Sequence, residues 1–441
     1  MAIFVPAAYM NATANSDGTT YTCTINSSGT QGSYTAATAP IVMPVDTAGY
    51  SAQAALTSYS SAAVAYTDKG FIYLYAGCRG RTHGAPTGVT DLKAAVRYYR
   101  YIQATQTDSL PGDADRIFAF GHSGGGAQSA VFGSSGDSSL YTPYLTAIGA
   151  VTDSGYSDAI CGAMCWCPIT NLDQADGAYE WNMGLTRSSL SSADASISKG
   201  LASSFAAYIN AVGFSDSSYN SGAALTLTET SDGYYQAGTY YDYVLSVINT
   251  SISNYNSDNS ASVSSESSVA AFASSYKNAA KGLGAFDDYD GKSTAENTLM
   301  GISGTAGHFD TKLQPLVDSY ASSYSSSFTS DLAATDSVGT SVATRLMMYT
   351  PLYYLVDNST YYGGYGTSTP AKYWRIRTGI DQTDTSLCTE VDLYLALKKL
   401  AAAGKISSVD FATVWGQGHT QAERTGSAAT NFISWVEDCC K

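Results

Sequence analysis

Residues 116–131 read RIFAFGHSGGGAQSAV, and this stretch decides which fold we expect. The apolar run RIFAF predicts a buried strand, and GGGAQSAVFG predicts the start of a helix. Between them, GHSGG (residues 121–125) matches the G-x-S-x-G nucleophile elbow, in which a tight strand-to-helix turn lifts the serine above the sheet edge. The glycines permit strained backbone dihedrals and a close approach of strand and helix. We therefore predict that Ser123 is a nucleophile; the alternative is a glycine-rich turn without chemistry.

Strands and helices alternate on both sides of this stretch. Apolar runs predict buried strands at 70–77 (GFIYLYAG) and 159–168 (AICGAMCWCP), and helical periodicity predicts a helix at 90–104. Such alternation is typical of a mostly parallel, doubly wound α/β sheet. Residues 1–65 instead read as antiparallel strands, with TYTCTI and APIVMPV among them.

The alternation stops near residue 170 and returns with the strand AKYWRIRTG (371–379). The intervening segment is rich in Ser, Tyr and Asn but keeps helix-like pieces such as YYDYVLSVI. Its aromatic content favours a large, mainly helical inserted lid domain over a disordered linker. We therefore predict three parts: a first part of the core (1–170), the lid domain (171–365) and a second part of the core (366–441).

The composition excludes several classes of partner. Charged residues make up 13% of the 441 residues, and the net charge is −15. Nucleic acids and anionic membranes need a basic surface, so we exclude both. The sequence has no apolar run of about 18 residues that would predict a membrane span, and its N-terminus does not resemble a signal peptide. The Lys-poor composition, rich in Ser, Thr and Tyr, nevertheless predicts a secreted or cell-surface protein whose leader has been removed.

The eight cysteines are too sparse for a disulfide scaffold. Cys161, Cys165 and Cys167 would share one side of a strand, but no fourth metal ligand is apparent in the sequence. We interpret them as buried thiols and predict neither a metal nor a cofactor.

Four histidines compete for the role of general base. His419 follows the last predicted core strand, which is where an α/β-hydrolase carries its base, so we predict that His419 activates Ser123. His122 adjoins the serine and should not reach its Oγ. His83 precedes the serine on a loop, and His308 falls within the lid domain.

The triad acid is expected on the loop after the penultimate strand, which reads TGIDQTDTS. Asp381 and Asp384 are both available, whereas Gln382 occupies the position three residues after the strand-end glycine. Either carboxylate could orient His419 and stabilise its imidazolium. We favour Asp384 and keep Asp381 as the alternative acid; Asp384 also precedes a helix, where an N-cap residue would lie.

An oxyanion hole needs two backbone N–H groups aimed at the developing charge. Gly124, directly after the nucleophile, supplies the first. We expect the second from the loop after the strand at 70–77, where Cys78 or Arg79 is the candidate.

Several longer stretches of the chain are similar to those of a known group of hydrolases, and they occur in the same order. They are GFIYLYAGCRGRTHGAPTGVTDLKAAVRYYRY, PGDADRIFAFGHSGGGAQSA, GAMCWCPITNLDQADGAYEW, and RIRTGIDQTDTSL followed by VDFATVWGQGHT. On these motifs the chain resembles the bacterial tannases and related feruloyl-esterase-like hydrolases. The resemblance implies an α/β-hydrolase fold, a lid domain, and hydrolysis of phenolic acid esters without cofactor or metal.

The resemblance also implies which residues of this chain correspond to the triad acid and to the substrate-binding residues of tannases. Tannases carry two aspartates, two residues apart, just before Thr-Ser. The first is the triad acid and aligns with Gln382; the second contacts the substrate and aligns with Asp384. The lysine and glutamate that hold galloyl hydroxyls in tannases correspond in place to Lys281 and Glu296.

We predict a serine carboxylesterase acting on hydroxycinnamic or hydroxybenzoic esters, either small or linked to plant polysaccharide. The candidate substrate-binding residues are Arg79, Lys281, Glu296 and Asp381. The alternatives are an acetyl esterase or a peptidase of the same fold, or a non-catalytic binding module.

Overall fold

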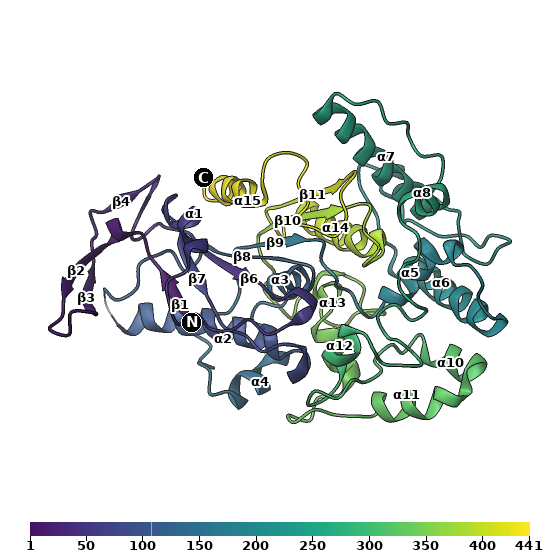
Figure 1. Ribbon diagram of the computed structural model, residues 1–441, viewed down its shortest axis with the longest axis horizontal. Coiled ribbons are helices and arrows are strands. Elements are labelled where there is room, and N and C mark those ends of the chain that lie inside the picture. The colour runs from purple at the N-terminus through teal and green to yellow at the C-terminus, as the bar shows by residue number, and fades with distance from the viewer. Residues whose placement is uncertain (107) are drawn as a thin grey trace.

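A seven-stranded sheet lies at the centre of the computed structural model, which describes residues 1–106 and 108–441 (Figure 1). In spatial order its strands are β1 (Ala2–Phe4), β7 (Ile72–Tyr75), β6 (Ile41–Val45), β8 (Ile117–His122), β9 (Gly162–Trp166), β10 (Tyr373–Gly379) and β11 (Ser408–Val414). The edge strand β1 is antiparallel to β7, and all other neighbouring pairs are parallel. The predicted α/β-hydrolase core with a mostly parallel sheet is therefore confirmed.

The N-terminal segment differs in one respect from the antiparallel arrangement that its sequence predicts. Residues Ile41–Val45 form β6, which pairs in parallel between β7 and β8. All five of its residues are buried, and burial on both faces is characteristic of parallel sheets. Among the named strands of the described residues, antiparallel pairing is confined to β1 and to two hairpins outside the sheet, at the left of Figure 1. These are β2 (Met10–Ala14) with β3 (Tyr21–Ile25), and β4 (Thr30–Gln31) with β5 (Tyr34–Thr35).

Helices cover both faces of the sheet. A side chain at Gly162 would meet Trp435 of α15 (Ala428–Cys439), whereas the next residue, Ala163, lies against α3 (Gly124–Ser134). Because successive strand residues point to opposite faces, α15 and α3 flank the sheet on opposite sides. Further helices of this part of the chain are α1 (Val64–Thr67), α2 (Thr87–Thr105), α4 (Thr142–Ala147) and α14 (Leu387–Ala402).

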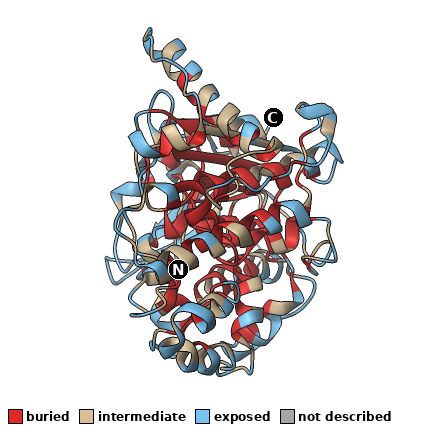
Figure 2. Ribbon diagram, turned by 90° about the vertical axis from the view of Figure 1, so that its right-hand side faces the viewer, coloured by how far each residue is buried: buried red, intermediate tan, exposed pale blue. Residues whose placement is uncertain are grey.

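The chain between β9 and β10, here called the helical insertion, packs beside the sheet at the right of Figure 1. Its helices are α5 (Ala175–Met183), α6 (Ser192–Val212), α7 (Thr239–Asn259), α8 (Val269–Tyr276), α9 (Ala295–Met300), α10 (Gln314–Tyr320), α11 (Ser325–Leu332), α12 (Val342–Met348) and α13 (Pro351–Leu355). One hydrophobic core runs through the sheet and most of the insertion, and Figure 2 shows these buried segments in red at the centre. A smaller apolar cluster joins α6, α10 and α11. The boundaries at residues 170 and 365 stay a prediction.

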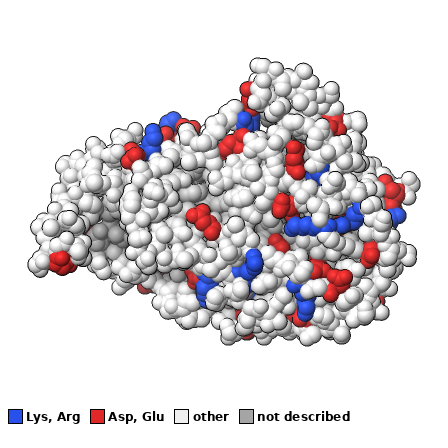
Figure 3. All heavy atoms as spheres, viewed as in Figure 1, with Lys and Arg blue, Asp and Glu red and all other residues white. Residues whose placement is uncertain are grey.

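Charged side chains are sparse on the surface, as the composition implies. On the face in Figure 3 they lie in small separate groups between wide uncharged areas. None of the described helices is both long and apolar enough to span a bilayer.

Candidate active site

Ser123 lies in the turn between β8 and α3, with φ 59° and ψ −124°. This conformation is strained for a residue with a side chain, and such strain is found where a functional group must be presented. The neighbouring glycines are required sterically. A Cβ at Gly125 would lie 2.0 Å from the carbonyl oxygen of Val45, and one at Gly121 would lie 2.4 Å from the carbonyl oxygen of Gly125.

His419 reaches Ser123 from the loop that follows β11. Its Nε2 lies 2.7 Å from Ser123 Oγ, within hydrogen-bond distance. Burial lowers the pKa of His419 to about 4, while Asp384 acts in the opposite direction. The imidazole is therefore neutral near pH 7 and can accept the serine proton. His122 packs against the same ring, with the two ring centroids 4.7 Å apart, and forms no hydrogen bond to the serine within the described residues.

The second nitrogen of His419 contacts an amide. Gln382 Oε1 lies 2.6 Å from His419 Nδ1, so Gln382 occupies the position of a triad acid. The expected hydrogen bond from His419 Nδ1 to Asp384 is not formed: the nearest Asp384 oxygen is 4.0 Å from Nδ1, and the Asp384 side chain is 44% exposed. Asp384 is thus an ionic neighbour of His419.

Asp381 does not reach His419 either. Its backbone N–H donates to the carbonyl of Gln417, and its Oδ1 is buried without a hydrogen-bond partner among the described residues. Burial raises the pKa of Asp381 to about 6, and the Lys277 ammonium acts against that rise. Asp381 lies one residue before Gln382 and Asp384 lies two residues after it, so their side chains have different surroundings.

The expected second oxyanion donors are already engaged. The N–H of Cys78 donates to the carbonyl of Gln53 at 2.9 Å, and the N–H of Arg79 donates to Asp91 Oδ2 at 2.8 Å. The predicted loop follows β7, but β6 lies between β7 and the nucleophile strand β8, so the loop after β6 approaches the serine instead. Gly49 in this loop lines the same cavity as Ser123, and its nitrogen would lie 3.2 Å from a Cβ at Gly124.

Ser123 and His419 open into a cavity of about 560 Å³. Lys281, Glu296 and Asp384 line this cavity, as do Gly49 and Ile169. Two sequence-predicted binding residues, Asp381 and Arg79, do not line it. Arg79 is held elsewhere by a bidentate ion pair, with Nη2 and Nε 2.8 Å and 2.9 Å from the carboxylate oxygens of Asp91.

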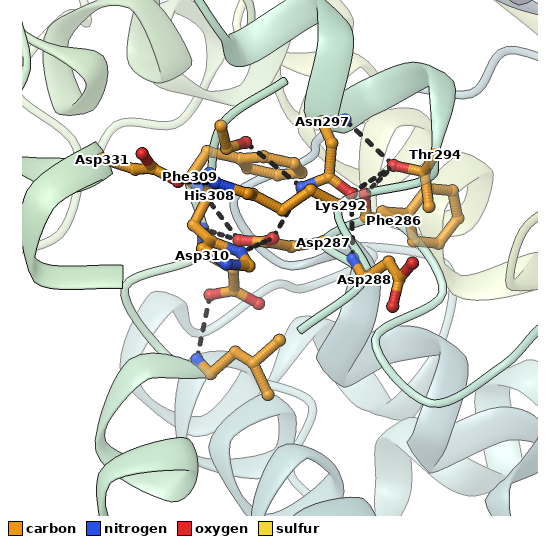
Figure 4. A network of polar contacts seen from close by, with 12 residues as sticks. Phe286, Asp287, Asp288, Lys292, Thr294, Asn297, His308, Phe309, Asp310 and Asp331 are labelled. Carbon is orange, nitrogen blue, oxygen red and sulfur yellow. Dashed lines mark hydrogen bonds and ion pairs between the residues drawn. The ribbon is translucent and has the colours of Figure 1, made fainter. Parts of the chain in front are cut away.

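A buried polar network fixes the segment that carries Lys281 and Glu296. Asp287 lies at its centre in Figure 4, where its carboxylate is 2.7 Å from His308 Nδ1 and also accepts the backbone N–H groups of Phe309 and Asp310. Asn297, one residue after Glu296, donates to the same carboxylate at 2.8 Å. His308 thus has a supporting role in the insertion, and His83 is exposed on its loop.

Three potential metal ligands come together beside the serine. Ligand atoms of His122, Cys167 and His419 lie within 4.8 Å of one another. Both nitrogens of His419 are engaged, however, by Ser123 and Gln382. Burial raises the pKa of the Cys167 thiol to about 11, which opposes formation of the thiolate that a metal requires. This donor set does not fit a resident metal ion.

The structure is similar to solved tannases. The native tannin acyl hydrolase from Lactobacillus plantarum is 27% identical, with a match covering 100% of this chain and 90% of that chain at a TM-score of 0.74. The tannase from Fusobacterium nucleatum is 28% identical, with a match covering 93% and 87% of the two chains at a TM-score of 0.71. A tannin acyl hydrolase in complex with ethyl gallate is 27% identical, with 100% and 90% covered and a TM-score of 0.74.

Neither the comparison with protein-family models nor the comparison with curated proteins gives a match. The structural similarity extends over the sheet and the helical insertion together, because the matches to the two tannin acyl hydrolase structures cover the whole chain. The chain is therefore a tannase-like carboxylic ester hydrolase with the α/β-hydrolase fold.

Proposed function

We propose that the protein hydrolyses esters of phenolic acids through Ser123 and His419. The observation that carries this proposal is the hydrogen-bonded series from Ser123 through His419 to Gln382 at the wall of a cavity that also holds Lys281 and Glu296. The series supplies an activated nucleophile, and the cavity supplies polar groups for a substituted ring.

The reaction follows from the positions of these atoms. Ser123 Oγ attacks the ester carbonyl while its proton moves to His419 Nε2. The tetrahedral intermediate collapses as His419 protonates the departing alcohol, which leaves an acyl-serine. His419 then takes a proton from water, the resulting nucleophile attacks the acyl group, and the acid is released with the serine restored.

The oxyanion of each tetrahedral intermediate needs two N–H donors. We propose the backbone N–H groups of Gly124 and Gly49 for this role. Gly124 begins α3, where the positive end of the helix dipole adds to the stabilisation. Gly49 adopts φ 56° and lies at the cavity wall, and neither its own N–H nor that of Tyr50 forms a backbone hydrogen bond in the described chain.

Lys281 and Glu296 are proposed to bind ring hydroxyls. Lys281 Nζ lies 4.1 Å from the centroid of the Phe286 ring, and Glu296 is almost fully buried. Burial raises the pKa of Glu296, whereas Lys281 lowers it. A phenolic hydroxyl can donate to Glu296 and accept from Lys281, and one solved tannin acyl hydrolase similar to this chain is a complex with 3,4-dihydroxybenzoate.

Replacing Glu296 by Gln or Lys281 by Met is expected to lower kcat/KM for methyl gallate about 10- to 100-fold and to change that for methyl benzoate much less. A site built to pair ring hydroxyls loses about 1–3 kcal/mol when a partner is removed, and benzoate has no hydroxyl to lose. Glu229, which is exposed and outside the cavity, provides the control variant Glu229→Gln. Equal losses on both esters would contradict hydroxyl recognition.

A panel of gallate, ferulate, benzoate and acetate esters and a peptide tests the proposed substrate class directly. Preference for acetate or for the peptide would favour the acetyl esterase or the peptidase. A fluorophosphonate probe that leaves Ser123 unlabelled would favour a binding module. We also propose secretion or display at the cell surface, which fits polysaccharide-linked esters as substrates; immunoblots of culture medium and washed cells test it.

A further inference from the structure

The amide that contacts His419 is bonded on its other side to a buried carboxylate. Gln382 Nε2 donates to Glu390 Oε1 at 2.9 Å and to Thr378 Oγ1 at 2.5 Å, while Gln382 Oε1 faces His419. Gln382 is 2% exposed and Glu390 is 0% exposed. A continuous path of hydrogen bonds therefore runs from Ser123 through His419 and Gln382 to Glu390.

This path fixes which end of the amide faces the histidine. An amide can present either oxygen or NH₂, but an ionised carboxylate only accepts hydrogen bonds. Above its pKa, the ionised Glu390 therefore holds the NH₂ of Gln382, and the amide oxygen points at His419 Nδ1. Thr378 supports the same orientation, because its hydroxyl donates to Glu390 Oε1 at 3.0 Å and leaves its lone pairs for Gln382.

The orientation of the amide sets the tautomer of His419. An amide oxygen accepts only from a protonated Nδ1, so Nε2 keeps the lone pair that takes the proton of Ser123. An amide turned by 180° would donate to Nδ1, move the proton to Nε2 and remove the base. An unanchored glutamine at the acid position would populate this inactive arrangement.

The charged group that acts on Glu390 is Lys277. Lys277, fully buried just after α8, lies close enough to interact with Glu390, and its Nζ has no hydrogen-bond partner among the described residues. Lys277 also interacts with Asp381, Asp384 and the thiols of Cys167 and Cys388. Burial raises the pKa of Glu390 to about 7, and Lys277 acts against that rise.

We propose that Glu390 is a positioning residue that takes over part of the role of a triad acid without contacting His419. It holds the Gln382 amide so that His419 keeps its proton on Nδ1. This inference rests on the proposed function, since it assigns Glu390 a role in the same reaction. It separates the two tasks of a triad acid: Gln382 accepts the hydrogen bond from Nδ1–H, and Glu390 supplies the orientation and the negative charge.

Glu390→Gln tests the anchor with almost no change of shape. We expect kcat on methyl gallate to fall about 10- to 100-fold with KM nearly unchanged, because substrate does not contact Glu390, whereas Glu229→Gln leaves both unchanged. In ¹⁵N spectra of the imidazoles, part of the His419 population should move its proton from Nδ1 to Nε2. A purely structural role for Glu390 would lower thermal stability without altering this tautomer.

The exchange Gln382→Glu with Glu390→Gln provides the rescue. It places the carboxylate directly on His419 Nδ1 and an amide donor behind it, so the double variant should recover at least tenfold of the kcat lost by Glu390→Gln alone. Failure of the folded double variant to recover, with His419 still protonated on Nδ1, would overturn the inference.

The pH profile supplies a third readout. Because Glu390 is ionised above its raised pKa, kcat/KM of the native enzyme should fall severalfold as the pH drops through about 7, and should fall again near the His419 pKa of about 4. Glu390→Gln should lack the first step. If Glu390→Gln keeps full activity while the separate variant Ser123→Ala is inactive, only this inference is overturned. If Ser123→Ala is active, the proposed function itself is overturned.

Discussion

Ser123→Ala is expected to lower kcat on methyl gallate by at least about 10⁴-fold, with binding of the ester largely kept. The variant loses the only nucleophile that His419 reaches at 2.7 Å among the described residues, while Lys281 and Glu296 stay at the cavity wall. The residual rate would come from oxyanion donors acting on a water-mediated reaction. Initial rates, together with titration of product acid binding, measure the two effects separately.

Ser129→Ala is the matched control for this loss. Ser129 lies buried in α3, the helix that follows Ser123, and its hydroxyl has no hydrogen-bond partner among the described residues, so its removal should leave kcat unchanged. The double variant Ser123→Ala with His419→Ala should be no slower than either single variant, because the two residues act as one unit. Additive losses would mean that His419 works on a different group.

Glu423→Ala is expected to lower the free energy of unfolding by about 3 kcal/mol, because the buried Arg375 then keeps, among the described residues, only its longer ion pair with Asp410, at 3.5 Å. Glu423 is 7% exposed and accepts from both terminal nitrogens of Arg375, at 2.5 Å and 2.7 Å. It also accepts from Trp166 Nε1 and Asn431 Nδ2, each at 2.9 Å. Urea denaturation at neutral pH measures the loss.

Asp258→Ala removes a surface ion pair and serves as the comparison. Asp258 pairs with Arg424, whose side chain is 38% exposed, so its loss should cost less than about 1 kcal/mol. Similar costs for the two variants would contradict the account of Glu423 as a buried anchor. The loop between β11 and Glu423 carries His419, so activity of Glu423→Ala should fall before the protein unfolds.

The sequence predicted that Ser123 and His419 act together, and the structure places them within hydrogen-bond distance. This pair could be predicted because few histidines were available. Only four histidines compete, and the order of strands leaves His419 as the one that follows the last core strand. The demand for glycine at position 121 is local, because its Cβ would meet the carbonyl oxygen of Gly125, whereas the demand at Gly125 comes from Val45 on β6. Features that depend on neighbours in the chain were therefore accessible from the sequence.

The remaining parts of the site depend on register and on sheet order. Asp381, Gln382 and Asp384 are close in sequence, and a turn of one residue decides which of them faces His419. The prediction favoured a carboxylate over Gln382, and Glu390, which accepts a hydrogen bond from Gln382, lies eight residues later on α14. Gly49 was missed because the sequence does not reveal that β6, rather than β7, neighbours β8.

The segment that carries Lys281 and Glu296 lies within one insertion, whereas Ser123, Gln382 and His419 each follow a strand of the sheet. The groups proposed to bind the ring and the groups proposed to cleave the ester therefore come from separate parts of the chain. Exchange of residues 281–297 among relatives, with Asp287 and its partners kept, would transfer acyl preference while the hydrolytic apparatus stays in place. Diversification of such enzymes is then expected to proceed by replacing one short segment rather than by rebuilding the sheet.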